Sequence, residues 1–128
     1  MRLYLEPSVL VKLFKTEIGS NEIIKTIVAI DEKEDWAGYT SRWSTLEVAR
    51  TLKKDGKPRE LILVDLQELK RHKLSLVPVT NRIIDDAEKL AMSYNIYASD
   101  ALHVATFEFL KKREKLERFL CDDVHFQS

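Results

Sequence analysis

This sequence of 128 residues contains little cysteine, glycine and proline and no long apolar run. We therefore expect no disulfide, no long irregular segment and no membrane helix. A single cysteine, Cys121, cannot form an intramolecular disulfide, which is typical of a reducing compartment, so we expect a cytoplasmic protein. Only 3 Gly and 3 Pro are present, which disfavours long loops. No apolar run approaches the roughly 18 residues of a membrane helix, and charge at Arg2 and Glu6 comes too early for a signal peptide.

Neither positive nor negative charge predominates in the sequence. Lys plus Arg and Asp plus Glu both number 21, so the formal net charge is +0. This balance excludes a strongly basic coat of the kind that binds nucleic acid over a whole surface. Nucleic acid itself is not excluded, because a metal ion or a rim of basic side chains can supply positive charge locally.

Short apolar runs alternate with longer stretches of helical periodicity. Strands are expected at residues 2–5, 36–40, 74–79 and 118–121, and helices from residue 8 to the break at 19–20, then at 21–30, 41–54, 59–71, 81–94 and 99–113. In the helix at 41–54 we expect Trp43, Leu46, Val48 and Leu52 to face inward. This order predicts one α/β domain over residues 1–128, a three-layer α/β/α sandwich around a central parallel sheet.

Four carboxylates fall where such a sheet places its functional groups. Glu6 and Asp123 follow the first and last expected strands, and Asp100 lies in the first turn of the helix that Ser99 is expected to cap. Glu47 lies inside the helix at 41–54 and can point into the same cleft. Because the carboxyl ends of parallel strands share one edge, we expect these groups to gather there.

A group of carboxylates is costly unless a cation lies among them. Two like charges about 4 Å apart repel by about 1 kcal/mol in water and by several times more in a partly dry site. Mg²⁺ or Mn²⁺ removes that cost, prefers oxygen ligands, and can lower the pKa of a bound water beside a phosphate. Taken singly, Asp100 or Asp123 is more often a capping or solvated residue. The coincidence of four favours phosphodiester hydrolysis over a phospho-receiver domain, whose strand-end lysine is missing here.

Four motifs carry a resemblance to a known family over essentially the whole chain. They are YLEPSVLVKLFKTEIGS (4–20), TSRWSTLEVAR (40–50), ASDALHVATF (98–107) and FLCDDVHF (119–126). Together they resemble the PIN-domain family, specifically the VapC-type toxins of prokaryotic toxin–antitoxin pairs. The resemblance implies an endoribonuclease that uses Mg²⁺ or Mn²⁺ and leaves 5′-phosphate and 3′-hydroxyl ends. It also implies a homodimer that an antitoxin protein holds inactive.

The family's four acidic residues fall on Glu6, Glu47, Asp100 and Asp123, which the resemblance makes catalytic, with Glu6, Asp100 and Asp123 as metal ligands. The chain departs from the family at Glu6, where Asp is usual. Because one extra methylene moves the carboxylate by about 1 Å, the alternative is a catalytically weak PIN-fold module that binds RNA or an antitoxin without efficient cleavage.

Further residues would support the carboxylates. Ser8 matches the family's small hydroxyl residue and would orient Glu6 or the phosphate. We expect His103, one turn after Asp100, to orient the metal ligands or to pack beside them rather than to bind the metal itself, because hard cations prefer oxygen. Lys12, Arg42 and Arg50 lie near the cleft in the sequence and are candidates for contacts to RNA phosphates. We also expect Leu10, Leu13, Phe14 and the helix at 59–71 to offer a dimer or antitoxin surface.

Overall fold

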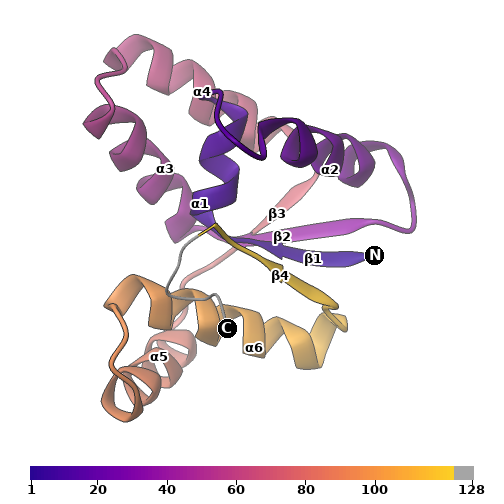
Figure 1. Ribbon diagram of the computed structural model, residues 1–128. Coiled ribbons are helices and arrows are strands. Elements are labelled where there is room, and N and C mark those ends of the chain that lie inside the picture. The colour runs from indigo at the N-terminus through magenta and orange to yellow at the C-terminus, as the bar shows by residue number, and fades with distance from the viewer. Residues whose placement is uncertain (123–128) are drawn as a thin grey trace.

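A parallel sheet of four strands, in the order β3-β2-β1-β4, forms the middle layer of the part of the chain that the structure describes, residues 1–122 of a computed structural model. The strands are β1 (Arg2–Leu5), β2 (Ala37–Ser41), β3 (Leu74–Val77) and β4 (Arg118–Leu120). The helices are α1 (Pro7–Leu10), the 3₁₀ turn η1 (Val11–Leu13), α2 (Ser20–Glu32), α3 (Trp43–Lys54), α4 (Arg59–Arg71), α5 (Asn81–Ser93) and α6 (Ala98–Glu114). Figure 1 shows α1 to α4 on one face of the sheet and α5 and α6 on the other, which confirms the expected α/β/α sandwich.

The central strand β1 divides its side chains between the two layers. Successive side chains of a strand point to opposite faces. Leu3 and Leu5 belong to the core under α1 to α4, whereas Tyr4 belongs to the core under α6. All three side chains are at most 3% exposed, so β1 is buried on both faces, as expected of a parallel sheet.

One helix turns a different face to the core from the one that its apolar pattern predicts. Trp43 and Leu46 of α3 were expected inward but are 42% and 54% exposed, whereas Val48 and Leu52 are buried as expected. Polar Ser44 takes the inward position of the first turn, because its hydroxyl hydrogen-bonds Thr40 on β2 at 2.6 Å. A satisfied hydroxyl can therefore replace an apolar side chain at the start of a buried face.

Some elements begin or end elsewhere than expected. The first helix, expected from residue 8 to the break at 19–20, ends at Leu10 and is followed only by the 3₁₀ turn η1. The connection at 14–19 is irregular, and its Ile18 carbonyl accepts a hydrogen bond from Lys12.

The strand β3 stops at Val77 because Pro78, which has no backbone N–H, cannot continue the ladder. The helix α6 begins one residue early, at Ala98, with Tyr97 rather than Ser99 at the N-cap position. The helix α5 is capped by Thr80, whose hydroxyl accepts a hydrogen bond from the backbone of the third helical residue. Within residues 1–122, no helix combines the length and the apolar character that crossing a membrane requires.

Candidate active site

Glu6 is a buried carboxylate at the point where β1 ends. Its backbone is extended, Pro7 occupies the first helical position, and the side chain folds back to cap α1. There the carboxylate accepts a hydrogen bond from the Ser8 backbone N–H at 3.3 Å and another from the Ser8 hydroxyl. With 4% of its surface exposed, Glu6 points into the protein rather than into solvent. The expected pairing of Ser8 with Glu6 is therefore present.

Glu47 comes to the same place from α3. Its Oε1 lies 2.6 Å from Nε2 of His103 on α6, so this contact joins the two helical layers at the carboxyl edge of the sheet. One oxygen of Glu6, one oxygen of Glu47 and one ring nitrogen of His103 lie within 4.8 Å of one another. Glu6 and Glu47 therefore lie together at this edge, although they are 41 positions apart in the sequence, and their catalytic roles stay a prediction.

Asp100 lies in the first turn of α6, three positions and about one helical turn before His103. It is 4% exposed, and the N-terminal end of a helix favours a negative charge. Among residues 1–122, the set of metal-ligating atoms within 4.8 Å consists of Glu6, Glu47 and His103 and does not include Asp100. The fourth expected carboxylate, Asp123, lies outside the described residues.

The charge on Glu6 is disfavoured where it lies. Burial is the main cause and raises the pKa of Glu6 above its ordinary value. The hydrogen bonds from Ser8 lower this pKa, and so does the electrostatic effect of the nearby His103. The Glu47 charge raises the pKa further, and burial outweighs the effects that lower it. A divalent cation would favour the ionised form. Because two of the three donors are carboxylate oxygens, from buried Glu6 and half-buried Glu47, these residues fit a hard ion such as Mg²⁺ or Mn²⁺.

Tyr4, which the sequence motifs do not single out, completes the contact that His103 and Glu47 make between the layers. The Tyr4 hydroxyl lies 2.7 Å from Nδ1 of His103, so His103 is held at both ring nitrogens, by Tyr4 and by Glu47. Tyr4 and His103 are both 0% exposed. The signal that could have found Tyr4 is the alternation within residues 2–5, which places it on the face of β1 that α6 covers.

Lys12, expected to contact RNA, is engaged with protein oxygens. It is only 6% exposed, and its Nζ lies 2.6 Å from the Ile18 carbonyl, 3.0 Å from Asp122 and 3.2 Å from Glu17. The Asp122 backbone N–H in turn donates to the Ser8 hydroxyl at 2.8 Å. Lys12 therefore ties the end of β4 to the α1–α2 connection. A phosphate contact from Lys12 stays a prediction, but this buried arrangement disfavours it.

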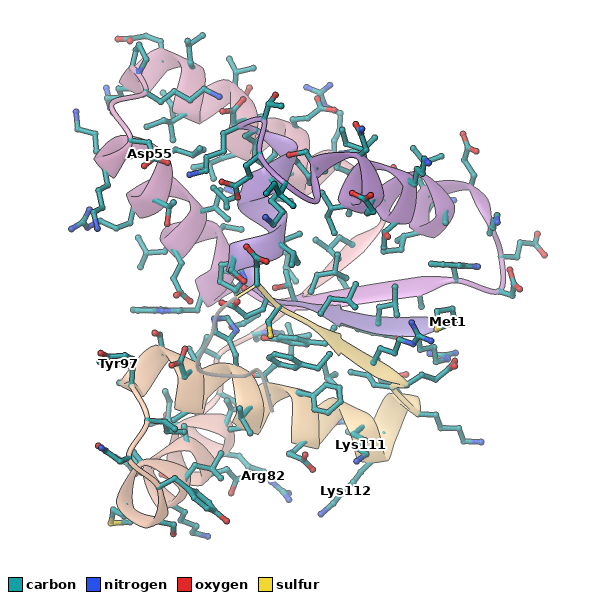
Figure 2. The ribbon with its side chains drawn as sticks, in the orientation of Figure 1. Met1, Asp55, Arg82, Tyr97, Lys111 and Lys112 are labelled. Carbon is teal, nitrogen blue, oxygen red and sulfur yellow. The ribbon has the colours of Figure 1, made fainter. Side chains whose placement is uncertain are left out.

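The remaining basic side chains are placed differently. Arg42 and Arg50 are exposed at the start and in the middle of α3, and Arg42 also donates to the Thr45 hydroxyl. Their contact with RNA stays a prediction. Figure 2 shows Lys111 and Lys112 near the far end of α6, opposite the end where Tyr97 lies, so these lysines complement the helix dipole away from the site.

The fold and the site define an α/β/α protein with buried carboxylates suited to a divalent cation. The chain belongs to the PIN domain family, whose sequence model matches residues 3–126. Mycobacterium tuberculosis VapC20, a sarcin-ricin loop cleaving toxin, has a similar structure, with a TM-score of 0.73 and 12% identity over 97% of this chain and 92% of its own. A toxin–antitoxin complex from Klebsiella pneumoniae is similar at a TM-score of 0.61 and 16% identity, over 91% of this chain and 82% of that one. No curated protein matches the chain significantly.

Proposed function

We propose that this protein is a metal-dependent endoribonuclease and the toxin of a type II toxin–antitoxin pair. The observation that carries the proposal is the pair of carboxylates at the carboxyl edge of a PIN-domain sheet, Glu6, which is buried, and Glu47, which is half-buried. The two similar structures, one a toxin that cleaves the sarcin-ricin loop and the other a toxin–antitoxin complex, support it. The proposed products are 5′-phosphate and 3′-hydroxyl ends.

In this proposal Glu6, Asp100 and Asp123 would hold the Mg²⁺ or Mn²⁺ ion. A bound divalent ion lowers the pKa of a coordinated water and stabilises the charge that develops on a phosphate. Neighbouring residues orient the two carboxylates Glu6 and Glu47. Ser8 fixes the rotamer of Glu6 through two hydrogen bonds, and His103 fixes Glu47. A fixed carboxylate loses little freedom when substrate and ion arrive, which favours the reaction.

Partners follow from the same family membership. We propose an antitoxin protein and a second copy of the chain as partners, and RNA as the substrate. Leu10 is fully buried and therefore cannot form part of a partner surface, contrary to our expectation. The helix α4 keeps that role, because Leu61 and Val64 are 51% and 57% exposed on it.

The decisive experiment compares Asp100→Asn with a matched control. We expect the wild-type protein to cut RNA in Mn²⁺ or Mg²⁺, to stop in EDTA, and to yield ends that an RNA ligase requiring a 5′-phosphate accepts. Asp100→Asn removes one negative charge from the buried site and should abolish cleavage. Asp85→Asn, the same change at an exposed position of α5, should not. Cleavage that persists both in EDTA and in Asp100→Asn would contradict the proposal.

The second candidate, a module that binds RNA or an antitoxin without efficient cleavage, is favoured by one feature. Glu6 is longer than the usual Asp, and its carboxylate is committed to capping α1 through Ser8. Glu6→Asp discriminates the two functions. A gain in Mn²⁺ affinity and in cleavage would mean that Glu6 weakens a working nuclease site, whereas RNA or antitoxin binding with no gain in either would support the binding module.

A further inference from the structure

A buried chain of hydrogen bonds runs from the sheet to the candidate active site. It begins at the Tyr4 hydroxyl, passes through both ring nitrogens of His103, and ends on Oε1 of Glu47, with donor–acceptor distances of 2.7 and 2.6 Å. The three residues come from β1, α6 and α3, so the chain crosses all layers of the molecule. Tyr4 and His103 are 0% exposed, which means that bulk water does not replace either partner.

The two hydrogen bonds of the His103 ring assign its proton to the same nitrogen. An ionised Glu47 can only accept, so Nε2 of His103 must donate to it. In a neutral imidazole Nδ1 then becomes an acceptor and requires a donor. The Tyr4 hydroxyl, 2.7 Å from Nδ1, meets that requirement, because a phenol with an ordinary pKa of about 10 keeps its proton at neutral pH.

The tyrosine ring is itself held in place, so that the hydroxyl has little freedom to move away. Tyr4 stacks on Phe119 with ring centroids 5.2 Å apart and an interplanar angle of 11°, and Phe107 contacts its edge. The hydroxyl therefore reaches His103 from a rigid support on the central strand. Rigid supporting groups that orient the side chains of a reactive site are a general requirement of metal and catalytic sites.

We propose that Tyr4 is a positioning residue of this site: its hydroxyl donates to Nδ1 of His103, keeps the imidazole proton on Nε2, and thereby holds the Glu47 carboxylate beside Glu6. The catalytic consequence rests on the ribonuclease activity proposed above. The location of the proton does not, because it is a property of the metal-free protein and can be measured without any substrate.

The first test is ¹⁵N NMR of the histidine side chains in the metal-free protein at about pH 8, above the ordinary histidine pKa of about 6.5. The chain has 3 His, and the spectrum of His103→Gln identifies the resonances of His103 by their loss. We expect the proton on Nε2 and a hydrogen-bonded, unprotonated Nδ1. A proton on Nδ1 in the wild-type protein would overturn the proposal, and this result needs no variant of Tyr4 to fold.

The second test removes only the hydroxyl. Tyr4→Phe keeps the ring and its stacking, and Tyr39→Phe, on the adjacent strand, is the matched control, since its hydroxyl bonds Arg2 at the surface at 2.9 Å. We expect Tyr4→Phe to shift the Nδ1 resonance of His103 and to lower kcat about 10-fold, the usual scale for losing such a supporting bond, with KM for RNA unchanged. Tyr39→Phe should do neither.

The outcomes separate the positioning role from the ribonuclease activity. An unchanged Nδ1 resonance in Tyr4→Phe overturns the hydrogen bond itself, whether or not the protein cuts RNA. A shifted resonance with unchanged kcat overturns the positioning role and leaves the ribonuclease standing. If the wild-type protein cuts no RNA, the proposed function fails, and the resonances of the wild-type protein and of Tyr4→Phe still decide where the proton lies.

Discussion

Glu6→Gln should stabilise the metal-free protein while destroying its response to metal. The native carboxylate is 4% exposed, burial raises its pKa, and the Glu47 charge raises it further. A group whose folded pKa lies above its unfolded one binds protons more tightly in the folded state, so its ionisation costs stability as the pH rises through the ordinary glutamate range. Gln keeps the shape and carries no charge. The gain should therefore be absent in acid and full at neutral pH.

The gain comes mainly from burial, because taking a carboxylate charge out of water costs several kcal/mol even after the protein relaxes. The Glu47 charge, on an oxygen within 4.8 Å of one of Glu6, adds a smaller cost. Against this, the two bonds from Ser8 weaken by about 1 kcal/mol in total when their acceptor loses its charge, and the electrostatic effect of His103 already offsets a further part of the cost. The net gain is about 1–2 kcal/mol, or roughly 3–8 °C in Tm for a domain of this size.

Thermal unfolding with and without Mn²⁺ is the assay. At a concentration about 100 times its Kd, Mn²⁺ should stabilise the wild-type protein by about 2.7 kcal/mol, or roughly 10 °C, and should leave Glu6→Gln nearly unchanged. Glu34→Gln, at an exposed position between α2 and β2, controls for the loss of one negative charge. A metal-free Glu6→Gln protein less stable than the wild type would refute the electrostatic account, and an intact Mn²⁺ response would refute the role of Glu6 as a ligand.

Two predictions concern the packing around the site. In Gly38→Ala the new methyl would lie 2.5 Å from an isoleucine of α2 that rests on β2, so we expect a loss of about 1–3 kcal/mol in urea unfolding, and an unchanged midpoint would contradict this close approach. Asp31→Ala should lose stability at neutral pH. Burial opposes the Asp31 charge, but hydrogen bonds from Lys73 and His72, both 2.7 Å long, outweigh it and lower the pKa of Asp31. This stability is present above the ordinary aspartate pKa and is lost as the pH falls through the lowered one, so the two unfolding midpoints should converge in acid. A difference that does not depend on pH would contradict it.

The layers and the sheet could be predicted from the sequence because they depend on local patterns. Short apolar runs between amphipathic stretches place most strands and helices within one or two residues, but the first helix, expected to reach the break at 19–20, ends at Leu10 and its 3₁₀ turn at Leu13. Two smaller differences have local causes. Pro78 ends β3 early, and Tyr97 precedes α6 where Ser99 was expected. Only part of the inward face of α3 could be predicted: Val48 and Leu52 are buried as expected, but the apolar pattern does not mark Ser44, whose hydroxyl is hydrogen-bonded to Thr40 in the core.

The candidate site shows the same division. Glu6 and Glu47 were found because both are unusual where they stand, one after a strand and one among apolar residues of a helix. Their meeting follows from the shared carboxyl edge of parallel strands. Tyr4 was missed because its partner, His103, is 99 positions away, and no local pattern marks a tyrosine whose hydroxyl will be buried against an imidazole.

The neighbours of each carboxylate explain how this cluster can fold before any cation arrives. Ser8 donates to Glu6, His103 donates to Glu47, and Asp100 lies in the first turn of α6, where the helix dipole favours its charge. These local contacts offset part of the repulsion but not the burial of Glu6, whose raised pKa shows that a cost remains. A divalent ion bound as proposed would favour the ionised carboxylate and so offset this residual cost. A site built in this way is rigid and still incomplete, so the metal response of Glu6→Gln reports on the ion rather than on the folding of the site.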